Sequence, residues 1–239
     1  MIEITDPLEE QRTWDPLRRH PTVPTPAWKP MGKDHREQFL LQLSRACRLC
    51  RNCELGTREA ERQLSGAVIA RDPHVFSNQA DSRFMIVGQN PGWDELAAGE
   101  PFVGAAGKNF EKAIRQHGLT RKDFYITNNV KCFTTGNARP SVRHQQACSP
   151  WLRLEIAAVR PVLVTTLGGS AFDVFCPELR FGDYVGRVVD SKEFGVKVFA
   201  AYHPSPLNSA NLEEFGRQMG LLCRTVIRYR AERSDGKRP

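Results

Sequence analysis

The chain has 239 residues, 40% of them hydrophobic and 26% charged, which is ordinary for one globular domain with extensions. No apolar run is long enough to cross a bilayer, and the acidic start lacks a secretory signal pattern, so we expect a cytoplasmic protein without a membrane partner. The formal net charge of +7 favours a polyanionic partner such as DNA, because basic side chains that neutralise phosphates release counterions.

The predicted elements follow a proline-rich start. Residues 1–33 show no apolar periodicity and are expected to be an extended arm. An amphipathic helix begins near residue 35, and residues 59–82 are expected to be a long loop or hairpin. Strands and helices then alternate up to a basic tail at 231–239. We expect strands at 84–87, 124–127, 162–167 and 196–201, and helices at 108–117, 142–159, from 170 onward, and at 212–230.

This alternation predicts a three-layer α/β/α domain over residues 34–230, with a central four-stranded, mostly parallel sheet. Ligands of such sheets bind beyond the carboxyl ends of the strands. Three strands end in polar segments at that edge: Gly-Gln-Asn-Pro-Gly at 88–92, Asn-Asn-Val-Lys-Cys at 128–132, and His-Pro-Ser-Pro-Leu at 203–207. A histidine and several carboxamides around one crevice suit a planar, hydrogen-bonding ligand such as a nucleobase.

Four motifs, in family order, resemble the uracil-DNA glycosylase superfamily. They are residues 88–92, Gly-Glu-Pro-Phe-Val-Gly-Ala-Ala-Gly at 99–107, Thr-Asn-Asn-Val-Lys-Cys at 127–132, and His-Pro-Ser-Pro-Leu-Asn at 203–208. The second and third resemble the family-four, iron–sulfur branch, and the resemblance covers residues 50–230. It implies a monofunctional DNA glycosylase that flips uracil out of DNA and hydrolyses its N-glycosidic bond, leaving an abasic site in base excision repair.

The resemblance implies two catalytic residues. Asn90 would position the attacking water, as in the mismatch-specific and single-strand-selective branches, and orients it without taking a proton. His203 would donate a hydrogen bond to the base oxygen on which negative charge develops. Asp94 and Glu95, just downstream of the first motif, are rival candidates for activating water, or else ordinary loop carboxylates.

Further residues would bind the base and the DNA. Phe102 would stack on the flipped ring, and the carboxamide of Asn128 would donate to and accept from the base edge, with Gln89 beside it. Ser205 and Leu207 would contact the DNA, and Leu207 would fill the space that the base vacates.

The first motif departs from the family-four pattern. Gln89 replaces an acidic residue, Asn90 replaces a small one, and Gly92 stands where the uracil-specific branch places a Tyr that blocks substituents at C5. An alternative substrate is therefore a modified or hypermodified pyrimidine, with defence against foreign DNA as a setting, unless Trp93 or Glu95 closes the gap. A second alternative is a non-catalytic iron–sulfur protein that binds damaged DNA.

Lys131 is the one lysine in these motifs that a Schiff-base mechanism would use. Its neighbour Cys132 is expected to turn the Lys131 side chain outward, so we predict no lyase activity. An outward-facing Lys131 could instead contact a DNA phosphate. The insertion that covalent-trapping relatives carry after this motif is not present, so we expect turnover rather than a permanent crosslink to DNA. We also expect a monomer that is associated with the nucleoid.

Seven cysteines are present, and Cys47, Cys50 and Cys53 fall in one short stretch, which indicates metal ligands rather than disulfides. The resemblance pairs Cys50 and Cys53 with Cys132 and Cys148 as ligands of a [4Fe–4S] cluster. Zinc is the competing metal, because four-cysteine zinc sites are common. Cys47 and Cys50 have the same spacing as Cys50 and Cys53, so the first two ligands could instead be Cys47 and Cys50.

Overall fold

The computed structural model describes residues 33–57 and 82–234. The predicted arm over 1–32, most of the segment predicted as a loop over 59–82, and residues 235–239 of the predicted tail lie outside the described residues. Within the described part of the chain, no helix is both long enough and apolar enough to cross a membrane.

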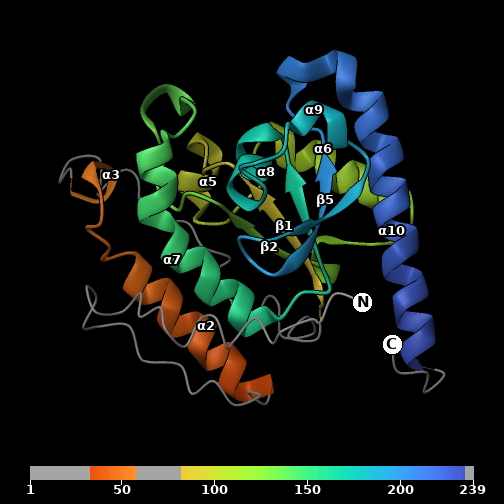
Figure 1. Ribbon diagram of the computed structural model, residues 1–239, viewed down its shortest axis with the longest axis horizontal. Helices are drawn as coiled ribbons and strands as arrows, with labels where there is room; N and C mark the ends of the chain where they lie inside the picture. Colours follow the sequence, from red (N-terminus) through yellow and green to blue (C-terminus); the bar gives the residue numbers. More distant parts are fainter. Residues whose placement is uncertain (1–32, 58–81, 235–239) are drawn as a thin grey trace.

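Strands and helices alternate from residue 84 onward, as predicted (Figure 1). The strands are β1 (Phe84–Gly88), β2 (Tyr125–Asn128), β3 (Leu163–Leu167), β4 (Val188–Ser191) and β5 (Val196–Ala201). The longer helices are α2 (Lys33–Cys47), α6 (Ala105–Arg115), α7 (Val142–Val159) and α10 (Leu212–Ser234). The shorter ones are α3 (Glu54–Thr57), α5 (Trp93–Ala98), α8 (Gly169–Phe175), α9 (Phe181–Tyr184), η2 (Arg121–Asp123), η3 (Thr135–Asn137) and η4 (Pro206–Asn211).

The sheet has five strands in the order β2-β1-β3-β5-β4, so the prediction of four strands was wrong by one. The four predicted strands pair in parallel, and the additional strand β4 pairs antiparallel with β5 at the edge. The strand β4 was not predicted because it is only four residues long and largely exposed, with Val188 facing solvent. An edge strand of this kind needs no buried apolar run.

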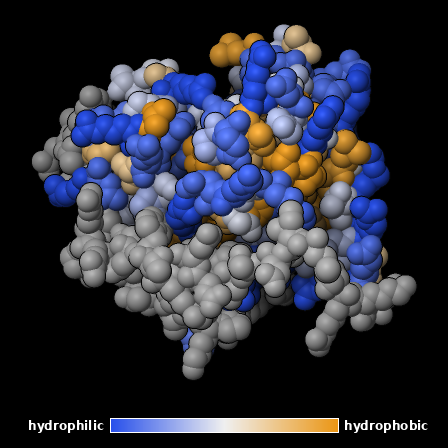
Figure 2. Space-filling model, viewed as in Figure 1, coloured by the Kyte–Doolittle hydropathy of each residue, from blue (hydrophilic) through white to orange (hydrophobic). Residues whose placement is uncertain are grey.

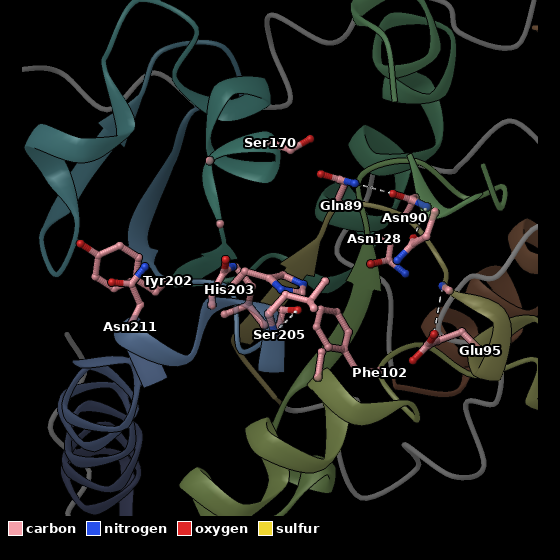
Figure 3. Close-up of a pocket in the computed structure, with 18 of the residues that line it drawn as sticks. Gln89, Asn90, Glu95, Phe102, Asn128, Ser170, Tyr202, His203, Ser205 and Asn211 are labelled. Carbon is pink, nitrogen blue, oxygen red and sulfur yellow. Dashed lines mark hydrogen bonds between the residues drawn. The ribbon is translucent and has the colours of Figure 1, made fainter. Parts of the chain in front are cut away.

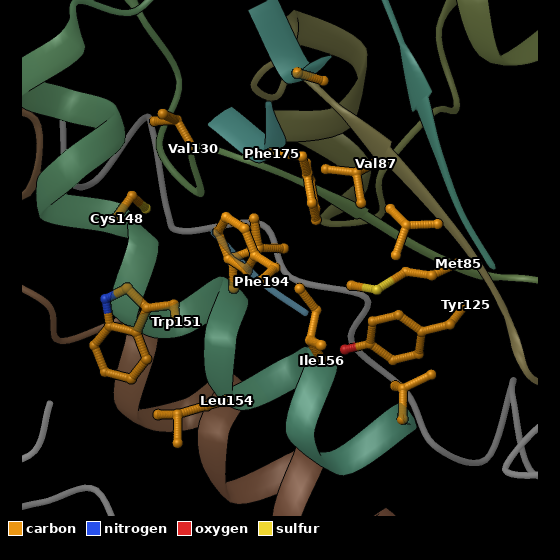
Figure 4. Close-up of a cluster of buried hydrophobic side chains, with 14 of the residues drawn as sticks. Met85, Val87, Tyr125, Val130, Cys148, Trp151, Leu154, Ile156, Phe175 and Phe194 are labelled. Atoms are coloured by element: carbon orange, nitrogen blue, oxygen red, sulfur yellow. The ribbon is translucent and has the colours of Figure 1, made fainter. Parts of the chain in front are cut away.

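Alternate residues of each strand face opposite helical layers, which makes the fold the predicted α/β/α sandwich. Met85 and Val87 of β1 belong to a core cluster with α2, α7 and α8, part of which Figure 4 shows. Phe84 and Ile86 belong to the cluster beneath α6 and α10. On the face of the molecule shown in Figure 2, hydrophobic side chains gather beside α10, where an apolar groove of about 390 Å³ lies between that helix and the sheet.

A buried ion pair joins the end of β2 to α7 inside the first core cluster. The Lys131 ammonium binds the Glu155 carboxylate, and neither side chain is accessible to solvent. Lys131 Nζ also donates to Thr127 Oγ1 at 2.8 Å and to the Asn128 carbonyl at 2.5 Å. Glu155 accepts from the Tyr125 hydroxyl at 3.1 Å, and burial raises its pKa against the opposing charge of Lys131.

The expectation that Cys132 turns Lys131 outward was therefore wrong. The lysine points into the protein because a buried carboxylate on α7, 24 residues away in sequence, compensates its charge. Buried in this way, the ammonium reaches neither a DNA phosphate nor the sugar of a substrate.

We predict that Glu155→Gln lowers the free energy of unfolding by roughly 3–5 kcal/mol, because it leaves the Lys131 charge buried without a counter-ion. Denaturant titration of the full chain measures the loss. Asp190→Ala is the control, since it breaks the exposed pair with Lys197 and should cost at most about 1 kcal/mol. A Lys131→Met/Glu155→Leu double variant should recover much of the loss, and equal costs for Glu155→Gln and Asp190→Ala would contradict the prediction.

Candidate active site

The carboxyl ends of β1, β2, β3 and β5 surround one cavity of about 480 Å³ (Figure 3). The strands are parallel, so the segments that follow them meet at the same edge of the sheet, as predicted. The cavity brings together all seven residues predicted to act on the base or the DNA: Gln89, Asn90, Phe102, Asn128, His203, Ser205 and Leu207.

Phe102 lies at the floor of the cavity in an unusual backbone conformation. Its φ of 56° is in the left-handed region, which a bulky side chain rarely adopts. Two glycines make room for it. A Cβ at Gly88 would overlap the Phe102 ring and lie 2.5 Å from Asn128 Oδ1, and a Cβ at Gly107 would overlap the Phe102 carbonyl. The two glycines therefore permit the close approach of the Phe102 and Asn128 side chains.

Asn128 and His203 face each other across the cavity with their polar atoms unused (Figure 3). Neither side chain makes a hydrogen bond to a residue that the structure describes, and the Asn128 side chain is almost fully buried. Burial lowers the pKa of His203 below its usual value, and the negative charge of Glu95 opposes that shift. The imidazole is therefore neutral near pH 7 and presents one N–H donor.

The Asn90 side chain is held by several hydrogen bonds. Its Nδ2 donates to the Pro91 carbonyl at 3.0 Å, to Thr134 Oγ1 at 3.1 Å and to Asn137 Oδ1 at 3.3 Å. Its Oδ1 accepts from Gln89 Nε2 at 2.8 Å. These contacts fix the rotamer of Asn90 and leave capacity on its carbonyl oxygen for one further donor. The supporting Thr134 and Asn137 were not predicted, because they lie more than 40 residues beyond Asn90.

Glu95 ties two loops of the site together. Its Oε2 accepts from the Gly92 N–H at 2.9 Å, and its Oε1 accepts from the N–H groups of Val103 and Gly104 at 2.9 and 2.8 Å. A Cβ at Gly92 would lie 2.7 Å from Glu95 Oε2, so the carboxylate occupies the space that a side chain at position 92 would enter. Trp93 is exposed and packs against Phe133.

The loop after β5 carries the residues expected to touch DNA. Ser205 Oγ accepts from the Leu207 N–H at 3.3 Å, which opens the turn η4. Leu207 is 94% exposed, an unusual position for an apolar side chain at the rim of a polar cavity. Asn109 on α6 donates to the Pro204 carbonyl at 2.9 Å and so anchors this loop, a contact that no sequence pattern indicated.

The four predicted metal ligands lie at one side of the sheet, where the end of α2 meets α7. Cys47, Cys50 and Cys148 are buried within the first core cluster, and the half-buried Cys53 and Cys132 pack against it. None of the seven cysteines, all of them in the described part of the chain, forms a disulfide. Residues 33–57 and 82–234 contain no set of three or more Cys, His, Asp or Glu side chains close enough together to hold one metal ion.

Hydrogen-bond donors nevertheless point at two of these sulfur atoms. Trp151 Nε1 donates to Cys50 Sγ at 3.3 Å, and the Lys131 backbone N–H donates to Cys148 Sγ at 3.2 Å. Cys148 and Trp151 project from the same stretch of α7 (Figure 4). Burial raises the pKa of the Cys148 thiol to about 12, Lys131 opposes the rise, and the thiols of Cys50 and Cys53 add to it. The thiols thus lie near one another although they come from segments far apart in sequence.

A mostly parallel sheet with a polar cavity and an exposed leucine at its strand ends suits an enzyme that takes a flipped-out base from DNA. The sequence model of the uracil DNA glycosylase superfamily matches residues 74–220. The chain belongs to this superfamily.

Its relatives support the family-four branch. A type-4 uracil-DNA glycosylase of Archaeoglobus fulgidus is 36% identical over 163 residues, which cover 63% of this chain and 81% of that protein. A type-4 uracil-DNA glycosylase of Thermotoga maritima is 35% identical over 135 residues, covering 56% of this chain and 70% of that protein. A type-5 uracil-DNA glycosylase of Pyrobaculum aerophilum is 36% identical over 146 residues, covering 54% and 63%.

Proposed function

We propose that this protein hydrolyses the N-glycosidic bond of a flipped-out uracil in DNA and leaves an abasic site. The observation that carries the proposal is that Asn128 and His203 line the same cavity as the Phe102 ring. Neither side chain has a hydrogen-bond partner among the described residues. The names of the relatives from Archaeoglobus fulgidus and Thermotoga maritima support uracil as the base.

Binding would use two side chains for the base and two for the DNA around it. The base leaves the duplex and stacks on Phe102, and the Asn128 carboxamide then accepts from the ring N–H and donates to an adjacent carbonyl. Leu207, already extended into solvent, would enter the gap left in the stack. Ser205 lies next to it and would contact the backbone of the strand.

Bond cleavage sends negative charge onto the departing base and positive charge onto the sugar. His203 would stabilise the base by donating a hydrogen bond from a neutral imidazole, which burial keeps unprotonated near pH 7. The Asn90 carbonyl would hold the attacking water against the sugar, since the contacts to Gln89, Thr134 and Asn137 fix its direction. The Glu95 carboxylate accepts hydrogen bonds from three backbone N–H groups and so holds the loop after β1 against the loop that carries Val103 and Gly104.

Cys50, Cys53, Cys132 and Cys148 are the proposed ligands of a [4Fe–4S] cluster. Four cysteine sulfurs are the ligands that such a cluster requires, and N–H donors directed at sulfur, as at Cys50 and Cys148, tune its reduction potential. When bound, the cluster would serve as a structural cross-link. The residues themselves join the end of α2 to the segment after β2 and to α7, and residues 34–230 would then form one glycosylase domain.

A modified pyrimidine is the second candidate substrate. The cavity of about 480 Å³ is larger than one pyrimidine ring needs, and Gly92 brings no side chain into it. The Glu95 carboxylate occupies the space beside Gly92 that a substituent at C5 of the base would need, which favours the unsubstituted uracil. A monomer that works on DNA in the cytoplasm, at the nucleoid, remains the predicted setting.

A panel of duplexes, each with one uracil or one modified pyrimidine, tests the proposed substrate. We expect abasic sites from the uracil duplex, detected as strand breaks after alkali, and slower release of bases with bulky C5 substituents. Preferential release of a bulky base would support the second candidate instead. If no duplex yields abasic sites although the protein still shifts their mobility, the chain is a non-catalytic DNA-binding protein.

His203→Ala should lower the single-turnover rate roughly 100- to 1,000-fold, because it removes one donor from the developing oxyanion. Affinity for uracil-containing DNA should stay close to that of the wild type. His117→Ala is the matched control, since His117 does not line the cavity. An unchanged rate in His203→Ala would show that the imidazole does not stabilise the leaving base.

Protein purified without oxygen should be brown and contain about four iron atoms per chain, as a [4Fe–4S] cluster requires. Cys148→Ala should lose the colour and most of the iron. Cys176→Ala, which alters a buried cysteine outside the proposed ligand set, should keep both. Loss of iron in Cys47→Ala but not in Cys53→Ala would shift the first pair by one step, and colourless wild type with about one zinc would exclude the cluster.

A further inference from the structure

The strained backbone at Phe102 is held from the side away from the cavity by one arginine. Arg121 lies in η2, 19 residues beyond Phe102, and is not among the cavity-lining residues. Its Nη1 donates to the Phe102 carbonyl and its Nη2 to the Pro101 carbonyl, each at 2.6 Å. The guanidinium thus binds two successive carbonyls of the turn in which φ is positive.

Arginine suits this contact because its two terminal nitrogens form a rigid planar fork, whereas a lysine is a single point donor. The guanidinium is also placed by its surroundings. Glu111 of α6 lies 3.4 Å from Nη1, and the Arg121 side chain is only 19% exposed. The turn η2 is itself capped, since Asp123 Oδ2 accepts from the Thr120 N–H at 2.6 Å.

The loop around Phe102 is therefore held from two sides. Glu95 binds the N–H groups of Val103 and Gly104 from the side of the cavity, and Arg121 binds the carbonyls of Pro101 and Phe102 from behind. The hydrogen bonds from Arg121 therefore act on the peptide between Phe102 and Val103, next to the residue whose φ is positive, and the Phe102 ring lies in the space that Gly88 leaves open.

We propose that Arg121 is a positioning residue that sets the Phe102 ring for stacking on the flipped base. This inference rests on the proposed function, in which Phe102 is the stacking platform. Arg121 touches neither base nor DNA in this role, so its effect on the reaction passes entirely through Phe102.

A double-mutant cycle tests this dependence. Arg121→Met should lower the single-turnover rate on uracil DNA roughly 10- to 100-fold, the range that loss of one base–aromatic stack implies. In a Phe102→Ala background the same substitution should have little further effect, because the ring that Arg121 places is gone. Arg121→Lys should retain part of the activity. A general structural role would lower the rate equally in both backgrounds, and that result would overturn the proposal.

Arg115→Met is the matched control. Arg115 pairs with the same Glu111, at 3.2 Å, but its side chain is 69% exposed and does not reach the Phe102 loop. This variant should keep the wild-type rate. Thermal unfolding of all variants separates a lost fold from a misplaced ring.

Hydrogen–deuterium exchange supplies a readout that does not depend on activity. The peptide spanning residues 101–104 should exchange faster in Arg121→Met than in the wild type or Arg115→Met. Unchanged exchange would overturn the proposal even if the rate fell. Wild-type protein that releases no uracil would contradict the proposed function instead, and the exchange rates would still decide whether Arg121 holds the loop.

Discussion

The buried ion pair between Lys131 and Glu155 connects the cavity at the strand ends to the cysteines beside α7. The Lys131 ammonium also donates to the backbone carbonyl of Asn128, whose side chain lines the cavity, and Lys131 directly precedes Cys132 in the chain. Its backbone N–H reaches Cys148 on α7. One residue therefore holds the end of β2 at the cavity, the segment with Cys132 and the part of α7 with Cys148. A buried charge tolerates little displacement, because its partner must stay within hydrogen-bonding distance.

The cavity is built before any substrate arrives. Asn90 is fixed by neighbours on the loop after β2, and the Phe102 turn is held by Glu95 and Arg121. The side chains of Asn128 and His203 line this cavity without a hydrogen bond to a residue that the structure describes. Hydrogen bonds within the protein fix the orientation of the surrounding side chains, which is the arrangement by which preorganised sites stabilise developing charge.

Much of the fold was predictable from local pattern, and the exceptions have physical causes. The buried parallel strands are continuous apolar runs, and α7 has the predicted bounds because Ser141 caps its start and Pro161 follows its end. The edge strand β4 was missed because it is short and exposed. The orientation of Lys131 was predicted wrongly because its partner, Glu155, lies on an element distant in sequence.

By itself, the sequence determined the order of strands and helices, the edge of the sheet at which polar residues gather, and the family, because short apolar runs and motifs are local properties. Only the tertiary structure decided how those residues are supported. It showed Glu95 as a brace, with its carboxylate beside Gly92, and placed Arg121 behind Phe102. The residues in these contacts come from different segments, and no repeating pattern in the sequence indicates that they meet. The strand register and the packing of the helices bring those segments together.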